Sequence, residues 1–239
     1  MKPLARKVAW LVLIAVIIAL RPPLSAWSQN QPAAPDASVP VKTTQTLKWR
    51  FGGNEAGSGS YTMRPDGTFE SATELNIMGQ SLKSRLTGKM VNGLITEFEI
   101  VTQQAGVEVK TSAKDGKAQI TVGKNSRTVD YKPASVLFGN LHPVLSQTWA
   151  KVLDPTKDGV QNIDVFALDG AATVKVAVTK KKTRTVEAGG KKQVANVYLA
   201  RLATVEFDVY LTEAGQFAAW DVPSQRLQAV ALGDRKSVV

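Results

Sequence analysis

The chain has 239 residues, no cysteine, a single histidine and a formal net charge of +10. The lack of cysteine excludes disulfide bonds and thiolate metal sites, and one histidine cannot form a two-imidazole zinc site. A positive charge favours anionic partners, but it bears on solubility and association and not on fold.

The N-terminus has the features of a secretory signal peptide. Three basic residues precede Val8–Leu20, which runs 13 residues without a charge. A membrane-spanning helix needs roughly 20 apolar residues, whereas the apolar core of a signal peptide needs about 7 to 15. We therefore predict a signal peptide over 1–28, cleaved after Ser28 or, as a second choice, Ala26. An uncleaved membrane anchor is the alternative.

Cleavage at this point would remove four basic residues and leave a net charge of +6. The remaining chain is long enough for one domain with its own core. Residues 29–45 contain three prolines and little that is large and apolar, so we predict a Pro-rich linker there. We predict a β domain over 46–232 and a C-terminal tail over 233–239. The expected location is the periplasm or the extracellular medium.

Short alternating or β-branched segments, each closed by a turn signal, fill the predicted domain, and this pattern is typical of an antiparallel sheet. A Gly-rich stretch, Gly52–Gly59, interrupts the first segments, and Asn92-Gly93 is a hairpin signal. The expected strands are Thr46–Phe51, Ser60–Arg64, Thr68–Ile77, Ser81–Met90, Leu94–Val101, Val107–Ser112, Ala118–Val122, Arg127–Tyr131, Val160–Leu168, Ala172–Thr185, Lys192–Leu202, Val205–Leu211, Gln216–Val222 and Arg226–Leu232.

The alternation breaks between Ala134 and Leu153, where apolar residues recur near helical spacing. We predict one helix there, interrupted around Pro143, with Trp149 buried. A flat sheet of this many strands would be unusual. The predicted fold class is therefore mainly all-β: a strongly curved antiparallel meander sheet or open barrel of about a dozen strands with one central helix.

No catalytic or metal constellation is evident in the sequence. His142 precedes Pro143 in the expected helix, and a packing or capping role is favoured over a hydrolase triad. Asp154, Thr156, Asp158 and Gly159 imitate the start of a calcium loop, but valine stands where a bidentate glutamate is required. We therefore predict a turn there, and neither a metal nor a cofactor.

One expected strand, Ala172–Thr185, changes character along its length. Three valines and then three cations share one parity, so an apolar face would turn cationic; these candidate ligand-binding residues are Val174, Val176, Val178, Lys180, Lys182 and Arg184. An amphiphile with an apolar tail and an anionic head would match such a face. The alternative is a solvated hairpin tip around Glu187-Ala188-Gly189-Gly190, formed by Lys180 to Arg184 with Lys191 and Lys192. Nucleic acid is not an expected partner, because no aromatic residue lies among these cations.

Three segments resemble a poorly characterised group of exported bacterial β domains: YTMRPDGTFES, LFGNLHPVLSQTW and VEFDVYLTEAGQFAAWDVPSQRLQAV. Domains of this kind stand alone or precede secreted α/β-hydrolases. The resemblance implies a curved antiparallel sheet similar in shape to periplasmic lipoprotein carriers, and it carries no catalytic residue over. Any hydrolase activity would then come from another polypeptide.

The expected function is that of an exported, non-enzymatic binding domain that holds a lipid-like ligand in a concave sheet. The alternative is a cell-envelope protein interaction module, or an accessory domain that partners a separate secreted hydrolase. An enzyme ranks third because catalytic groups are scarce. After signal cleavage no stable membrane span is expected.

Overall fold

The computed structural model describes residues 43–188 and 191–233. All of them belong to one compact unit that spans 37–239. The expected signal peptide and most of the expected linker lie outside the described residues. The described part folds into one sheet of sixteen strands, and nearly all neighbouring strands run antiparallel. The mainly all-β prediction is confirmed.

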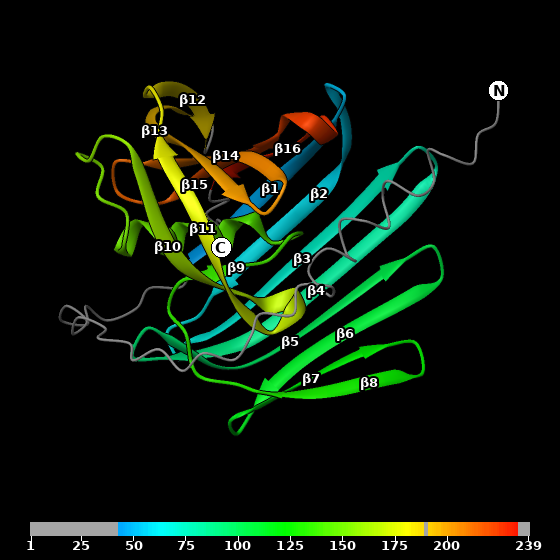
Figure 1. Ribbon diagram of the computed structural model, residues 1–239. Coiled ribbons are helices and arrows are strands. Elements are labelled where there is room, and N and C mark those ends of the chain that lie inside the picture. The colour runs from blue at the N-terminus through cyan, green and yellow to red at the C-terminus, as the bar shows by residue number, and fades with distance from the viewer. Residues whose placement is uncertain (1–42, 189–190, 234–239) are drawn as a thin grey trace. The chain divides into compact units, whose positions relative to one another are not determined.

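Eight strands form the first half of the sheet, each joined to the next by a tight turn (Figure 1). They are β1 Thr43–Phe51, β2 Asn54–Met63, β3 Thr68–Ile77, β4 Gln80–Val91, β5 Leu94–Gln104, β6 Val107–Lys114, β7 Lys117–Val122 and β8 Asn125–Asp130. Asn92 and Gly93 both have positive φ, as the hairpin signal predicts.

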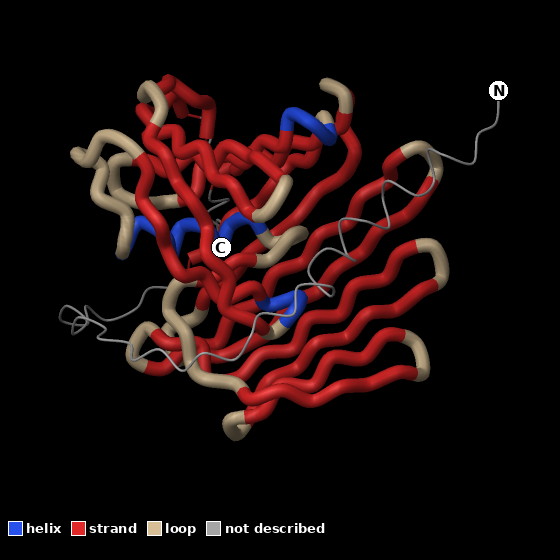
Figure 2. The backbone as a smooth tube through the Cα atoms, in the orientation of Figure 1, coloured by secondary structure: helices blue, strands red, loops and turns tan. Residues whose placement is uncertain are grey.

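The second half contains eight more strands and three short 3₁₀ helices (Figure 2). The strands are β9 Leu137–Phe138, β10 Val160–Ala167, β11 Ala172–Lys180, β12 Arg184–Ala188, β13 Lys191–Leu202, β14 Val205–Thr212, β15 Phe217–Val222 and β16 Leu227–Gly233. The helices are η1 Pro143–Lys151, η2 Leu168–Gly170 and η3 Pro223–Gln225.

Strand order follows chain order within each half, and the halves meet where β1 pairs with β16. The sheet runs from β8 through β1 and β16 to β9 and does not close on itself; β12 lies off this path and pairs with β13. Among the described strands, the one parallel pairing is between β9 and β10. A curved, open meander was the prediction, and the topology confirms it.

The core lies on the inner face of the sheet, which we define as the face that carries Trp49, Phe207 and Trp220. Phe207 is in ring contact with Trp220 at 5.9 Å and with Trp149 of η1 at 6.1 Å. Trp49 and Trp220 meet edge to face at 5.8 Å. Trp149 is fully buried, as predicted. Aromatic pairs of this kind contribute about 0.5–1.5 kcal/mol each beyond the area that they bury.

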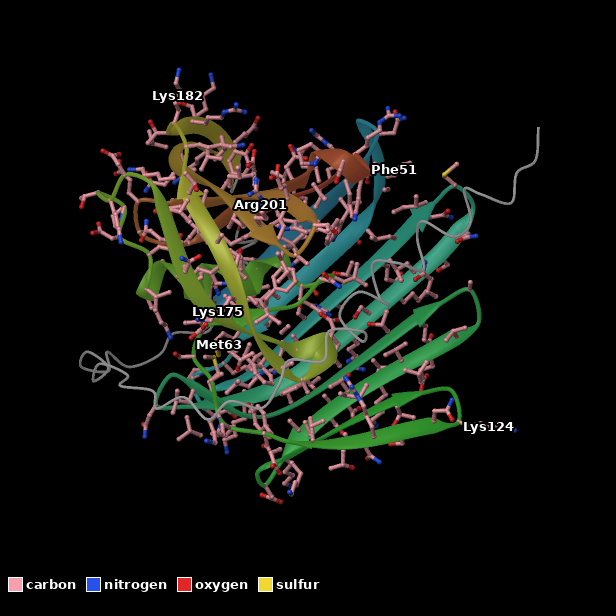
Figure 3. All side chains as sticks on the ribbon, in the orientation of Figure 1. Phe51, Met63, Lys124, Lys175, Lys182 and Arg201 are labelled. Carbon is pink, nitrogen blue, oxygen red and sulfur yellow. The ribbon has the colours of Figure 1, made fainter. Side chains whose placement is uncertain are left out.

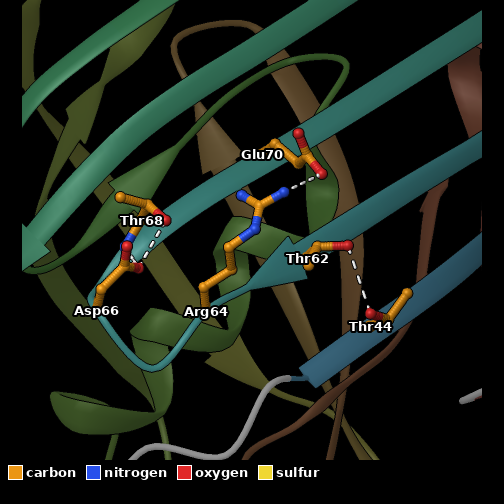
Figure 4. Close-up of polar contacts among 6 residues, drawn as sticks. All are labelled: Thr44, Thr62, Arg64, Asp66, Thr68 and Glu70. Atoms are coloured by element: carbon orange, nitrogen blue, oxygen red, sulfur yellow. Dashed lines mark hydrogen bonds and ion pairs between the residues drawn. The ribbon is translucent and has the colours of Figure 1, made fainter.

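The opposite, outer face of the first half carries polar pairs between neighbouring strands, as expected for a face in water. Figure 4 shows the Arg64–Glu70 ion pair at 2.7 Å and the contact between the Thr44 and Thr62 hydroxyls at 3.4 Å. Further cross-strand ion pairs on this part of the sheet are Lys83–Glu74, Lys110–Glu99 and Lys114–Glu97. Exposed pairs like these contribute little to stability.

The segment predicted as one helix over Ala134–Leu153 is different in the structure. Its first part contains strand β9, and only η1 is helical, beginning at Pro143, where the missing amide hydrogen costs nothing. Side chains of η1 bond to the free edge of β9: the Thr148 hydroxyl accepts from the Leu137 amide at 2.9 Å, and the Trp149 indole donates to the Leu137 carbonyl at 2.8 Å. The apolar spacing therefore reflects burial of the whole segment and not one amphipathic helix.

The Gly-rich stretch Gly52–Gly59 was expected to interrupt the sheet, but most of it belongs to β2. A side chain at Gly57 would place its Cβ 1.9 Å from the Glu74 carbonyl oxygen, and at Gly59 it would meet the Trp49 indole nitrogen at 3.2 Å. Glycine is therefore needed for close strand contact and for room beneath Trp49.

The ends of the β domain also differ slightly from the expected 46 and 232. β1 begins at Thr43, so three residues of the expected linker 29–45 pair with β2, and β16 ends at Gly233, the first residue of the expected tail. Among the described residues, the longest apolar helical segment falls short of what a membrane crossing requires.

Candidate functional site

The predicted strand Ala172–Thr185 is split into β11 and β12, and both pair with β13. Lys180 lies opposite Tyr198, and Arg184 lies opposite Ala195. From Lys180 to Arg184 the chain advances four residues, whereas the partner strand β13 advances only three, from Tyr198 to Ala195. One extra residue therefore bulges out around Lys181. The Lys181 amide donates to the Val197 carbonyl at 2.7 Å. A one-residue bulge moves every later side chain to the opposite face.

The three valines before this break lie on the inner face. Val178 is paired with Ala200, which in turn is opposite Phe207, so all three residues share the core face. Val176 and Val178 are buried, and Val174 is half-buried. The valine face therefore points inward, but Val176 and Val178 are packed in the core of the protein.

The three predicted cations separate at the break. Lys180 keeps the parity of the valines, and its ammonium group donates to the Pro155 carbonyl at 2.5 Å. Arg184 lies on the outer side, because it is opposite Ala195, and Lys182 is exposed between them. The expectation that all six residues share one face is wrong, and the extra residue at Lys181 is the physical reason. Ligand binding by these residues stays a prediction.

Five residues on the outer side of β12, β14, β15 and the segment that leads into β12 form a group that we call the charged cluster: Lys181, Arg184, Asp208, Tyr210 and Asp221. The Lys181 ammonium group lies 2.8 and 3.2 Å from the two Asp208 carboxylate oxygens. Arg184 donates to the Tyr210 hydroxyl. Asp208 and Asp221 are opposite each other on neighbouring strands. Two anions and two cations are thus held together.

β12 covers this cluster, because β12 packs against β15 and β16 as well as pairing with β13. Beneath it lies a small second core: Ala195, Val197 and Ala219 are almost fully buried beside Tyr210. The side chain of Asp208 is 12% exposed. Burial of a carboxylate to this degree requires a charged or hydrogen-bonding partner, which Lys181 supplies.

The cluster shifts two of its own pKa values upward. Burial raises the pKa of Tyr210, and the negative charge of Asp208 raises it further. Burial also raises the pKa of Asp221, again with help from Asp208, whereas Arg184 and Lys181 oppose the rise. Each shift disfavours the anionic form, because desolvation and a neighbouring like charge both act against it.

Exposed cations and valines gather beside the cluster at the end of the sheet where β10–β13 meet. We call this region the basic end and define it by Lys182, Lys191, Lys192, Val160 and Val194. The three lysines are exposed, and Val160 and Val194 are 57% and 48% exposed. Val160 is opposite Thr179 and Val194 is opposite Thr185, so they flank the break on its two sides. Figure 3 labels Lys182 at this end and Lys124 far from it.

His142, the remaining candidate for chemistry, is fully buried and bonded at both ring nitrogens. Nδ1 lies 2.8 Å from the Ser71 hydroxyl, and Nε2 lies 2.9 Å from the Ser84 hydroxyl, which also contacts Thr102. Burial lowers the pKa of His142 to about 3. A serine beside a histidine suggests a nucleophile and its base, but both ring nitrogens here are occupied by hydroxyls and the side chain has no access to solvent.

The calcium-like segment forms a turn, as predicted: the Asp154 carboxylate accepts from the Thr156 amide at 2.8 Å and from its hydroxyl at 2.7 Å. Within the described ranges, no group of three acidic, histidine or cysteine residues is placed to hold a metal ion.

The sequence reasoning missed Asp208 and Asp221. A signal was present, because aspartate is depleted in strands and both residues interrupt apolar strand patterns. Their pairing depends on the β14–β15 register, which includes a shift between Tyr210 and Leu211.

No family model and no curated protein matches the chain. Two solved structures resemble its fold at 12% identity. One is a beta-barrel-like protein of the domain of unknown function DUF1849 from Brucella abortus, with a TM-score of 0.48 over 80% of this chain and 95% of that one. The other is a DUF1089 family protein from Pseudomonas aeruginosa, with a TM-score of 0.41 over 85% and 98%. Both likenesses concern the fold alone, and the resemblance to hydrolase-linked domains stays a prediction.

Proposed function

We propose that this protein is an exported, non-enzymatic binding domain whose basic end contacts the anionic headgroups of a lipid surface. The observation that carries the proposal is the gathering of exposed lysines and exposed valines at one end of the sheet. Residues 180–192 contain six basic residues and one acidic residue. Two of the six are held by the charged cluster, and Lys182, Lys191 and Lys192 project into solvent.

The size of the expected effect follows from membrane electrostatics. A lysine near an anionic bilayer contributes about 1 kcal/mol, so three lysines contribute roughly 3 kcal/mol. Lysine stems can also lie along apolar surface while their ammonium groups stay in water, so Val160 and Val194 can sit at headgroup level beside them. Binding of this strength is reversible and is weakened by salt.

The buried state of Val176 and Val178 is the reason to place the contact at the surface and not inside the concave sheet. An acyl tail on the inner face would compete with the side chains of β11 and η1. The proposed ligand class remains an anionic amphiphile, but the proposal assigns its headgroup to the basic end. Burial of His142 between two serines supports a non-enzymatic role, and the N-terminal leader pattern supports export.

Vesicle flotation with the protein purified from its own host tests the proposal. We expect binding to phosphatidylglycerol vesicles at 0.05 M salt, loss of binding at 0.5 M salt, and none to phosphatidylcholine. Changing Lys182, Lys191 and Lys192 together to glutamate abolishes binding. The matched control changes three exposed lysines in or next to the first half of the sheet, Lys89, Lys124 and Lys132, to glutamate and retains binding.

Equal loss in both triple variants would mean that net charge alone matters, and absence of vesicle binding by the unmodified chain would refute the proposal. Capture of an acidic envelope protein through the same three lysines, without vesicle binding, would favour the interaction module instead.

A further inference from the structure

The charged cluster lies directly beside the basic end, and two of the cations in residues 180–192 are committed to it. Lys181 is paired with Asp208, and Arg184 bonds to Tyr210. With both carboxylates ionised, the two aspartates balance these two cations. The net charge offered to a partner then depends on the lysines outside the cluster.

The arrangement of the two carboxylates makes one of them sensitive to protons. Asp208 and Asp221 are opposite each other on antiparallel neighbours, and like charges in this position repel. Asp208 has the closer cation, because Lys181 contacts both of its oxygens. Asp221 feels the charges of Lys181 and Arg184 only from a distance. Its opposite residue on β16 is Gln228, which is uncharged. Asp221 is therefore the carboxylate with the weaker support from neighbouring cations, and we take it as the site of proton uptake.

We propose that Asp221 couples proton uptake to anion binding at the basic end. An ionised Asp221 neutralises one cation of the cluster, and a protonated Asp221 leaves that positive charge uncompensated beside Lys182, Lys191 and Lys192. The inference rests on the proposed function, since it regulates the same surface.

The coupling acts in both directions, as linkage requires. A proton on Asp221 strengthens the attraction for an anionic surface, and an anionic surface at the basic end holds the proton on Asp221 more tightly. The raised pKa of Asp221 agrees with this arrangement, because burial first and the negative charge of Asp208 second disfavour its ionised form. The side chain of Lys181 is 42% exposed, so the field of the cluster reaches solvent.

Asp221→Asn tests the inference, because asparagine keeps the shape of the carboxyl group and fixes its charge at zero. Binding to phosphatidylglycerol vesicles is measured from pH 7.5 down to pH 4.0 in low salt. At pH 7.5 the variant binds about fivefold more tightly than the unmodified chain, which corresponds to ~1 kcal/mol for one charge. As the pH falls, the unmodified chain approaches the affinity of the variant, whose own affinity changes little.

Asp115→Asn is the matched control, since it removes one negative charge at the β6–β7 turn, where asparagine tolerates the positive φ of 51°. Its affinity stays within twofold of the unmodified chain, and its pH dependence is retained. Tryptophan fluorescence at each pH confirms that every variant is folded.

A second measurement does not depend on a variant. Carbon-detected NMR titration of the Asp221 carboxyl, with and without soluble short-chain phosphatidylglycerol, should show about fivefold higher proton affinity in the presence of the lipid. Vesicle binding with the same pH dependence in the unmodified chain and in Asp221→Asn would overturn the inference alone, as would an Asp221 titration that the lipid leaves unchanged. Absence of vesicle binding at every pH would overturn the proposed function and this inference with it.

Discussion

Acid sensitivity of the fold is the prediction that follows most directly from a single side chain, His142. The imidazole is fully buried between Ser71 and Ser84, and burial lowers its pKa to about 3. In the unfolded chain the pKa of histidine is about 6.5. Between these two values the unfolded chain holds a proton that the folded protein excludes, so folding stability falls as the pH falls from about 6.5 toward 3.

The size of the loss can be worked out from the two pKa values. Each pH unit inside the window corresponds to about 1.4 kcal/mol, so His142 alone removes about 2–3 kcal/mol between pH 7.5 and pH 4.5. A domain of ordinary stability has about 5–15 kcal/mol in total. Titration of this one histidine therefore removes a substantial fraction of the stability of such a domain.

His142→Gln is the informative variant, because glutamine offers polar atoms to the serines without titrating. At pH 7.5 it should be less stable by about 1–3 kcal/mol, since one serine hydroxyl is left without its partner. At pH 4.5 the difference from the unmodified chain should shrink, vanish or reverse, because only the unmodified chain loses the roughly 2–3 kcal/mol linked to His142. Urea unfolding at the two pH values, followed by tryptophan fluorescence, measures both free energies.

Carboxyl groups also titrate in this window, but both proteins contain the same ones, so their contributions cancel in the comparison. The reasoning would be refuted if the difference in unfolding free energy between the two proteins were the same at pH 7.5 and at pH 4.5.

Two further predictions concern packing. Gly57→Ala should destabilise the fold by more than the 1–3 kcal/mol typical of overpacking, because its Cβ would lie 1.9 Å from a carbonyl oxygen of β3. The control is Gly53→Ala, whose Cβ meets nothing within 4 Å although Gly53 also has positive φ. Equal melting temperatures of the two variants would contradict this reasoning. Trp149→Ala should lower the free energy of unfolding by about 3–5 kcal/mol. Trp149→Phe should lower it less, since phenylalanine loses mainly the hydrogen bond to Leu137. Denaturant titration measures both free energies, and a Phe variant as unstable as the Ala variant would show that the hydrogen bond and not the packing dominates.

Much of the sheet could be predicted because strand and turn signals act locally. The Thr68–Ile77 strand matches β3 at both ends, and the turn at Asn92 and Gly93 has the positive φ angles that its residue types favour. Such signals depend on backbone preferences within a few residues. These local preferences do not depend on which distant segments pair with the strand.

Long-range register could not be predicted in the same way. The bulge at Lys181 arises because β11 and β12 must both pair with β13, and periodicity along one strand contains no information on its partner. The same limit hid the opposition of Asp208 and Asp221. Burial of the segment around η1 misled the helix prediction, because a segment covered on most sides has apolar residues at many spacings.

The pairing of β1 with β16 has a consequence for how the sheet is assembled. Thr46 lies opposite Gly233, so this ladder joins strands from the two ends of the described chain, whereas most other ladders join strands consecutive in sequence. Contacts of such separation form slowly, because a long loop must close before they stabilise anything. Until β16 docks, both β1 and β15 present an unpaired edge, and exposed edges recruit other chains. Docking of β16 onto β1 therefore decides whether the two halves join each other or stay open to aggregation.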